Sequence, residues 1–105
     1  MGHEINITTQ TLKVLKPFLD NPAREIAGVE VIRSSRLASG TAYPIMLRLE
    51  RHGLLTSRWE KGEPAQLGRP RRRYYTITAH GAATARQAFA ELSMPQGAVL
   101  MPETI

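Results

Sequence analysis

Two short segments of the sequence gather the side chains that could do chemistry. Residues 39–48 read SGTAYPIMLR, with hydroxyl groups, a phenol ring and one arginine, whereas residues 68–75 read GRPRRRYY, with four arginines. Guanidinium groups bind phosphate and carboxylate oxygens, often through two parallel hydrogen bonds. Such a cluster can also be a solvated face without a ligand. However, ten cations stand against three carboxylates between residues 33 and 73, and four against six elsewhere. The middle of the chain is therefore predicted to bind a polyanion such as nucleic acid.

The remaining composition excludes several other kinds of site. The chain has 105 residues, enough for one compact domain, and a formal net charge of +5. It contains no cysteine, which excludes disulfides and thiolate metal sites and favours a cytoplasmic protein. No apolar run reaches the roughly 18–20 residues that would span a membrane. Because His3, His52 and His80 lack metal-ligand spacing, we expect no metal, no cofactor and no enzymatic activity.

Apolar periodicity predicts three helices before the second cationic segment. They cover residues 9–19, 28–35 and 39–52, and an extended link or edge strand occupies residues 24–27. The side chains expected to face the core are Leu12, Leu15, Phe18 and Leu19 in the first helix, Val29 and Ile32 in the second, and Ala42, Ile45, Met46 and Leu49 in the third.

The start of the third helix is unusual because it contains Pro44. A proline here lacks the N–H that would bond to the Gly40 carbonyl, and its ring crowds that carbonyl. Ser39 is predicted to be the N-cap, and Gly40 can relax its backbone around the proline ring. Exposed N–H groups and the helix dipole at such a start favour an anion. In the winged helix-turn-helix arrangement predicted below, this end of the helix faces bases and phosphates.

The second half of the chain changes period. Residues 54–60 and 73–78 favour strands that pair as a hairpin around a loop at residues 61–71. Thr78 is expected to cap a last, alanine-rich helix. The prediction is a mainly α fold with a β-hairpin wing, a winged helix-turn-helix with one C-terminal helix. Residues 1–93 would form this DNA-binding domain, including a dimerisation helix at 78–93, and residues 94–105 a flexible tail.

Several motifs together resemble the PadR family of transcriptional regulators. They are E-x-x-G-x-E at residues 25–30, SGTAYP at 39–44, RLE at 48–50 followed by GL at 53–54, SRWE at 57–60, GRPRRRYY at 68–75, and Thr78 with Gly81. The resemblance covers roughly residues 10 to 92 and is strongest for the short members of the family. It implies a homodimeric repressor that binds double-stranded DNA at a near-palindromic operator, often with release by a small molecule. The sequence names no such effector.

The resemblance assigns site residues by position. The DNA-binding residues it implies are Ser39, Gly40, Thr41, Tyr43, Pro44, Arg48, Arg69, Arg71 and Arg72. The residues expected at a dimer interface are Leu12, Ala82, Ala85, Phe89 and Leu92. The chain departs from the family at Leu47, where a polar or basic residue is common, at Arg36, where glycine is frequent, and at Ala79-His80, which replace a common Pro-Glu pair. These departures leave the fold prediction intact and put the operator in doubt.

Four alternatives remain open at this point. The apolar face of the last helix can cover its own domain only, instead of forming a dimer interface. A winged helix can serve as a protein-protein interaction module, although such modules usually lose the basic wing. Tyr43 can be a core aromatic residue rather than a DNA contact. Trp59 is expected to pack against the third helix, with an effector pocket at the dimer centre as the alternative role.

Overall fold

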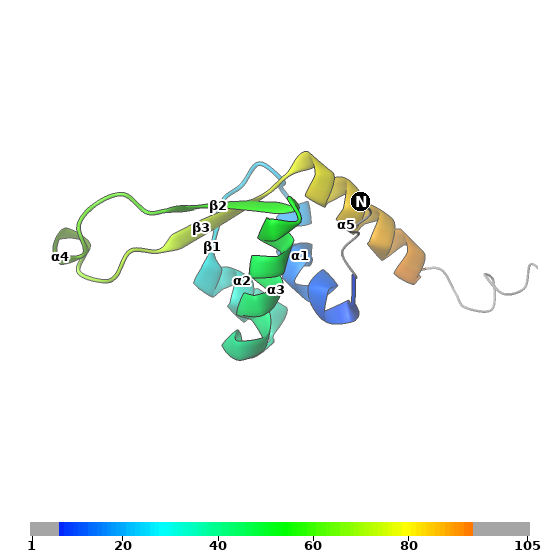
Figure 1. Ribbon diagram of the computed structural model, residues 1–105, viewed down its shortest axis with the longest axis horizontal. Helices are drawn as coiled ribbons and strands as arrows, with labels where there is room; N and C mark the ends of the chain where they lie inside the picture. The colour runs from blue at the N-terminus through cyan, green and yellow to red at the C-terminus, as the bar shows by residue number, and fades with distance from the viewer. Residues whose placement is uncertain (1–6, 94–105) are drawn as a thin grey trace, which may run out of the picture.

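The computed structural model describes residues 7–93, in which three helices lie against one side of a small sheet (Figure 1). The helices are α1 (Thr9–Leu19), α2 (Gly28–Ser35) and α3 (Ser39–Arg51). The hydroxyl of Thr8 accepts the Thr11 N–H at 3.1 Å and caps α1. The predicted order of three helices, a hairpin and a last helix is confirmed.

The sheet has three antiparallel strands in the order β1-β3-β2. They are β1 (Ile26–Ala27), β2 (Leu55–Trp59) and β3 (Arg73–Ile77). Leu55 pairs with Ile77 at the core end of the hairpin, and Trp59 pairs with Arg73 at its outer end. The hairpin therefore runs from the core out into solvent as a wing, with α4 (Pro64–Leu67) at its tip (Figure 1).

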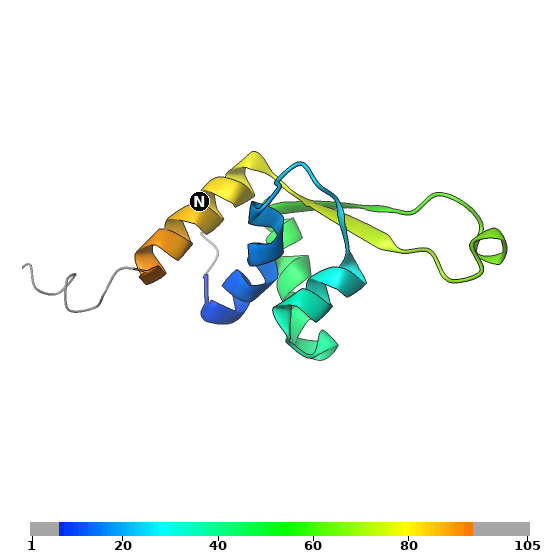
Figure 2. The same cartoon turned by 180° about the vertical axis from the view of Figure 1, so that it is seen from behind.

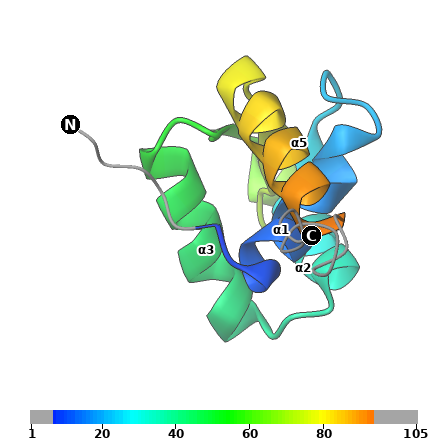
Figure 3. The ribbon, with the colours of Figure 1, turned by 90° about the vertical axis from the view of Figure 1, so that its right-hand side faces the viewer.

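The last helix, α5 (Ala79–Ser93), leaves the sheet at the end opposite the wing tip (Figure 2). Thr78 caps it as predicted, because its hydroxyl accepts the Gly81 N–H at 2.9 Å. The same hydroxyl donates to the Gly53 carbonyl at 2.7 Å, which ties the helix start to the loop before β2. Figure 3 shows α5 lying across α1.

One hydrophobic core joins these elements. It is built around Phe18 and Leu15 of α1, Met46 and Leu49 of α3, and Leu54 before β2, none of which is more than 1% exposed. All four predicted core residues of α3 are buried, so the face of this helix was predicted correctly. The opposite face of α3 is left for solvent or a ligand.

Three predictions about the helices are wrong. Val29 is 46% exposed, and the buried valine of α2 is Val31, because the short helix turns its other face to α1. Ser39 is the first helical residue of α3, and the N-cap is the extended Ala38. The segment predicted as loop contains α4. The predicted flexible tail, residues 94–105, lies outside the described residues.

Candidate nucleic-acid interface

The turn between α2 and α3 fixes how the two helices cross. Arg36 ends α2 in the left-handed conformation, with φ of 61°, at the position where the family often has glycine. The Ser35 hydroxyl donates to the Ile32 carbonyl at 2.7 Å and accepts the Leu37 N–H at 3.1 Å. These two hydrogen bonds close the turn, so α3 leaves it in a fixed direction.

The start of α3 is open to solvent. The Ala38 carbonyl accepts the Thr41 and Ala42 N–H groups at 2.9 Å each, while no side chain caps this end. Uncapped N–H groups at a helix start attract anions. A Cβ at Gly40 would meet nothing within 4 Å, so a large partner can approach the backbone closely at this residue.

The predicted DNA-facing side chains of α3 lie on its outer face. Ser39, Gly40, Pro44 and Arg48 are exposed, and Thr41 is half-buried. Tyr43 is 48% exposed, which excludes the alternative of a core aromatic residue. The structure thus brings these residues together along one side of the helix.

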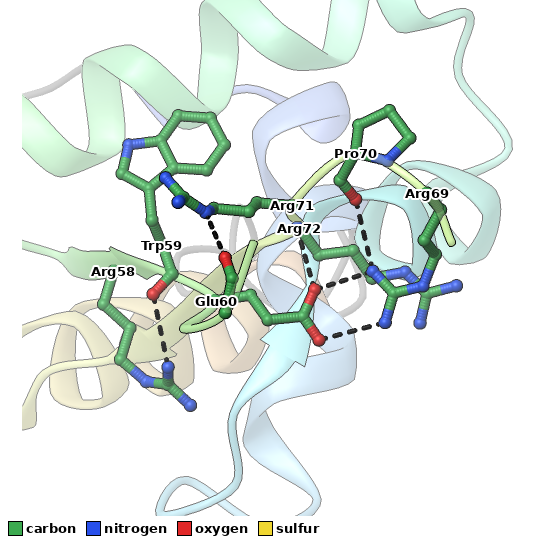
Figure 4. A network of polar contacts seen from close by, with 8 residues as sticks. Arg58, Trp59, Glu60, Arg69, Pro70, Arg71 and Arg72 are labelled. Carbon is green, nitrogen blue, oxygen red and sulfur yellow. Dashed lines mark hydrogen bonds and ion pairs between the residues drawn. The ribbon is translucent and has the colours of Figure 1, made fainter. Parts of the chain in front are cut away.

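A carboxylate closes the base of the loop at the end of the wing (Figure 4). Glu60 follows β2, and its two oxygens accept the guanidinium of Arg69 at 2.6 and 2.9 Å. One of these oxygens also accepts the Arg72 N–H at 3.1 Å. The Arg69 guanidinium, with the Arg72 N–H, lowers the pKa of Glu60 to about 2. Glu60 therefore stays ionised and holds both sides of the loop together.

The wing arginines differ in how far their charges are already paired. Arg69 is paired with Glu60. The Nε of Arg71 donates to the Gly62 carbonyl at 2.6 Å, and its guanidinium forms an ion pair with Glu63 at 3.4 Å. Within residues 7–93 the exposed guanidinium of Arg72 has no hydrogen bond or ion pair. Arg72 is thus the wing arginine most available to an anionic partner.

The inner face of the wing forms a groove with the helices. Its volume is about 430 Å³, and Tyr43 of α3, Val29 of α2 and Trp59 of β2 provide much of its apolar surface. Its other lining residues are Gly28, Arg69, Pro70, Arg71, Arg72, Arg73 and Tyr75. The lining holds four arginines and no carboxylate, but Arg69, Arg71 and Arg73 are paired with carboxylates outside it, so Arg72 provides the charge left for an anion.

Trp59 is not buried against α3, contrary to the prediction. Its side chain is 58% exposed, and the Arg73 guanidinium lies 4.9 Å from the ring centroid. Arg73 also donates to the Ser57 hydroxyl at 3.0 Å, which donates to Glu50 of α3 at 2.6 Å. This chain of contacts connects α3 to the wing and holds the indole in place.

A second ion pair braces the outer face of the wing. Arg58 of β2 donates through two nitrogens to the Glu25 carboxylate at 2.6 and 2.7 Å, and its guanidinium lies 5.1 Å from the Tyr74 ring. The hydrogen bonds from Arg58 lower the pKa of Glu25. The roles of Glu25 and Glu60 were not predicted; for Glu60, its place within an arginine-rich hairpin was a usable signal.

The residues expected at a dimer interface fall into two groups. Leu12, Ala82 and Ala85 are at most 5% exposed and are covered by their own chain, where the two alanines let α5 approach α1 closely. Phe89 is half-buried, and Leu92 is 59% exposed near the end of α5. Leu92 is accordingly the residue of this set that is most open to a partner.

The described residues provide neither a metal site nor a helix that could span a membrane. Residues 7–93 contain no cluster of three or more histidine, aspartate or glutamate side chains arranged to hold a metal ion. None of the helices in that range has the length and hydrophobicity needed to cross a membrane.

The chain matches the family model described as the Transcriptional regulator PadR-like family over residues 27–87, from β1 into α5. It is similar to a PadR family transcriptional regulator from Eggerthella lenta, with 25% identity, a TM-score of 0.64, and coverage of 91% of this chain and 87% of that one. A PadR-like transcription factor from Bacteroides fragilis gives 22% identity, a TM-score of 0.61 and 78% coverage of both chains.

A third similar structure is BpsR of Bordetella bronchiseptica, whose DNA binding is regulated by 6-hydroxynicotinic acid. It gives 21% identity and a TM-score of 0.63, covering 81% of this chain and 60% of that one. No curated protein matches the chain. These structures share the winged-helix fold found here.

Proposed function

The chain belongs to the PadR-like family of DNA-binding transcriptional regulators, and from this premise we propose that it is a homodimeric repressor of a near-palindromic operator. A family of transcription regulators agrees with the expectation that the chain is not an enzyme. Because such a regulator acts on genomic DNA, we keep the proposal of a cytoplasmic location.

The observation that carries the proposal is the arrangement of α3 beside the wing. Tyr43 of α3 and the unpaired Arg72 line one groove, whose lining contains no carboxylate, and the uncapped start of α3 lies one turn before Tyr43. In a winged helix-turn-helix, the second helix of the motif enters the major groove. We therefore assign the α3 side chains to base and phosphate contacts and the wing to the neighbouring backbone or minor groove.

Individual roles follow from exposure and pairing. Arg48 lies on the exposed face of α3, one turn after Pro44, and is assigned to a phosphate or a guanine edge. We assign Arg71 and Arg72 to phosphates. Because Arg69 is already paired with Glu60, its main role in this proposal is to hold the wing closed.

The proposed dimer is formed by α5. Its exposed Leu92 and half-buried Phe89 supply apolar surface near the end of the helix. Two copies related by a two-fold axis would present two α3 helices to half-sites about one helical turn, roughly 34–36 Å, apart. Occupying such an operator blocks access to the promoter, which is the basis for proposing a repressor.

The experiment is a titration of the protein into labelled DNA from upstream of its own coding region, with unrelated DNA of equal length as control. Preference for the upstream fragment and a footprint with two-fold symmetry are expected. Arg48→Ala should reduce this preference, since a bidentate guanine contact contributes roughly 1–3 kcal/mol of discrimination. Equal binding to both fragments would refute the assignment of an operator at that locus.

The interaction-module alternative makes a different prediction in the same assay. A module of that kind would bind neither fragment at low salt, where basic proteins bind DNA most tightly. That result would contradict the proposed function as a whole.

A further inference from the structure

The groove between α3 and the wing combines exposed apolar side chains with arginines. Arginines alone would be enough to bind DNA phosphates, so the apolar side chains call for an explanation. Its floor contains three large side chains that are about half exposed, namely Val29 at 46%, Tyr43 at 48% and Trp59 at 58%. Its rim carries arginines and no carboxylate. Exposed apolar surface gathered beside arginines indicates a binding site for a partner that has both apolar and anionic groups.

The strand pairing places this surface on one continuous face. Trp59 opposes Arg73, and Ser57 opposes Tyr75, so these four side chains lie on the face of the hairpin that leads back to the core. In Figure 4, Trp59 and Arg58 leave β2 on opposite sides. The indole therefore faces the groove, and Arg58 with Tyr74 faces away from it.

We propose that this groove seats one sugar–phosphate strand of the DNA, with the Trp59 ring against a deoxyribose and Arg72 against an adjoining phosphate. This inference rests on the proposed function. If α3 lies in the major groove and the wing at the minor groove, the DNA strand that separates these two grooves lies between α3 and the wing. A deoxyribose offers an apolar face and its phosphates are anionic, which matches the floor and the rim.

The fixed orientation of Trp59 supports this role. Arg73 covers one side of the ring and is itself held by Ser57 and Glu50, the latter at 3.6 Å. The indole is thus ordered before DNA arrives and loses little freedom on binding. Since Arg73 is already engaged, Arg72 is left to neutralise the phosphate.

The size of the contact can be worked out from exposure. A tryptophan side chain can bury about 150–250 Å². Since Trp59 is 58% exposed, a sugar that covers half of its open surface buries about 60 Å² of this side chain. At about 25 cal/mol per Å², this corresponds to roughly tenfold in affinity. The contact touches no base and neutralises no phosphate, so it should be independent of sequence and of salt.

The test uses Trp59→Ala, with Tyr74→Ala as the matched control, because Tyr74 is an aromatic residue on the outer face of the same hairpin. Trp59→Ala should weaken binding by roughly tenfold for upstream and unrelated DNA alike, with an unchanged slope of log affinity against log salt. Tyr74→Ala should weaken it much less. Arg72→Ala should instead lower the slope by about one.

Trp59 is the only tryptophan in the sequence, so its fluorescence reports directly on the groove. Saturating DNA should shield it from acrylamide quenching. Equal losses for Trp59→Ala and Tyr74→Ala, a loss confined to one DNA sequence, or unchanged quenching would overturn the groove assignment while leaving DNA binding intact. Shielding by benzoate, a small aromatic anion, but not by DNA would also overturn it, because Trp59 would then line an effector pocket. Failure of the wild-type protein to bind any DNA would overturn both the groove and the proposed function.

Discussion

Replacing a helical glycine by alanine is expected to have opposite effects on stability at two positions of this chain. Gly81 lies in the first turn of α5, where an added Cβ would overlap the Leu54 carbonyl oxygen and lie 2.9 Å from Cγ1 of Ile77. That carbonyl accepts the Thr78 N–H at 3.0 Å, so its displacement breaks the junction between the hairpin and α5. Gly40, in the first turn of α3, has open space at the same position.

The expected changes in the free energy of unfolding differ in sign. Gly81→Ala gains about 1 kcal/mol of helix propensity, loses about 1 kcal/mol with the Thr78 hydrogen bond, and adds overpacking of about 1–3 kcal/mol. Its net effect should be a destabilisation of about 1–3 kcal/mol. Gly40→Ala meets no neighbour and should stabilise the protein by about 0.5–1 kcal/mol.

Urea unfolding followed by far-UV circular dichroism, at one protein concentration, measures both variants. The account is refuted if Gly81→Ala is as stable as Gly40→Ala, because the overlap at Leu54 would then be relieved without loss. Since we propose that the start of α3 contacts DNA, Gly40→Ala should also bind DNA less tightly while being more stable.

Three further predictions concern the wing, the turn and α5. The Glu60 carboxyl should protonate near pH 2 in an NMR titration rather than near 4.5. Its contribution to the free energy of unfolding should be present above pH 4.5 and be lost as the pH falls towards 2. Glu60→Gln should lack this pH-dependent contribution. Arg36→Gly should raise the free energy of unfolding by about 0.5–1 kcal/mol in thermal or urea unfolding, because a non-glycine residue is disfavoured in the left-handed conformation. Leu92→Lys should lower the sedimentation coefficient of the proposed dimer; an unchanged coefficient would place the interface elsewhere.

The sequence predicted well whatever a repeating apolar pattern or a local cap determines. Thirteen residues of α3 carry one clear buried face, and Thr78 sits directly before α5, so both were located correctly. The eight residues of α2 have a valine on either side, and the pattern alone did not decide that Val31 rather than Val29 is buried. In so short a helix, the packing partner chooses the face.

The candidate site was predictable in its elements but less so in its contacts. The arginine-rich hairpin could be found from composition, whereas pairing of Glu60 with Arg69 depends on how the loop between them folds back. Pro64 and Gly68 were local signals for α4, a proline at the helix start and a left-handed glycine at its end, which the loop prediction overlooked. The exposure of Trp59 follows from the length of the wing beyond the helices.

The most direct test of the central claim is the salt dependence of DNA affinity for the wild-type protein and for Arg71→Ala/Arg72→Ala. Each phosphate contact contributes about 0.9 to the slope of log affinity against log salt, so the double variant should show a slope lower by about two. Lys13→Ala/Lys16→Ala removes two exposed cations of α1 and should leave the slope unchanged. Parallel lines for the wild-type protein and the wing variant would contradict the account, because the wing would then neutralise no phosphate.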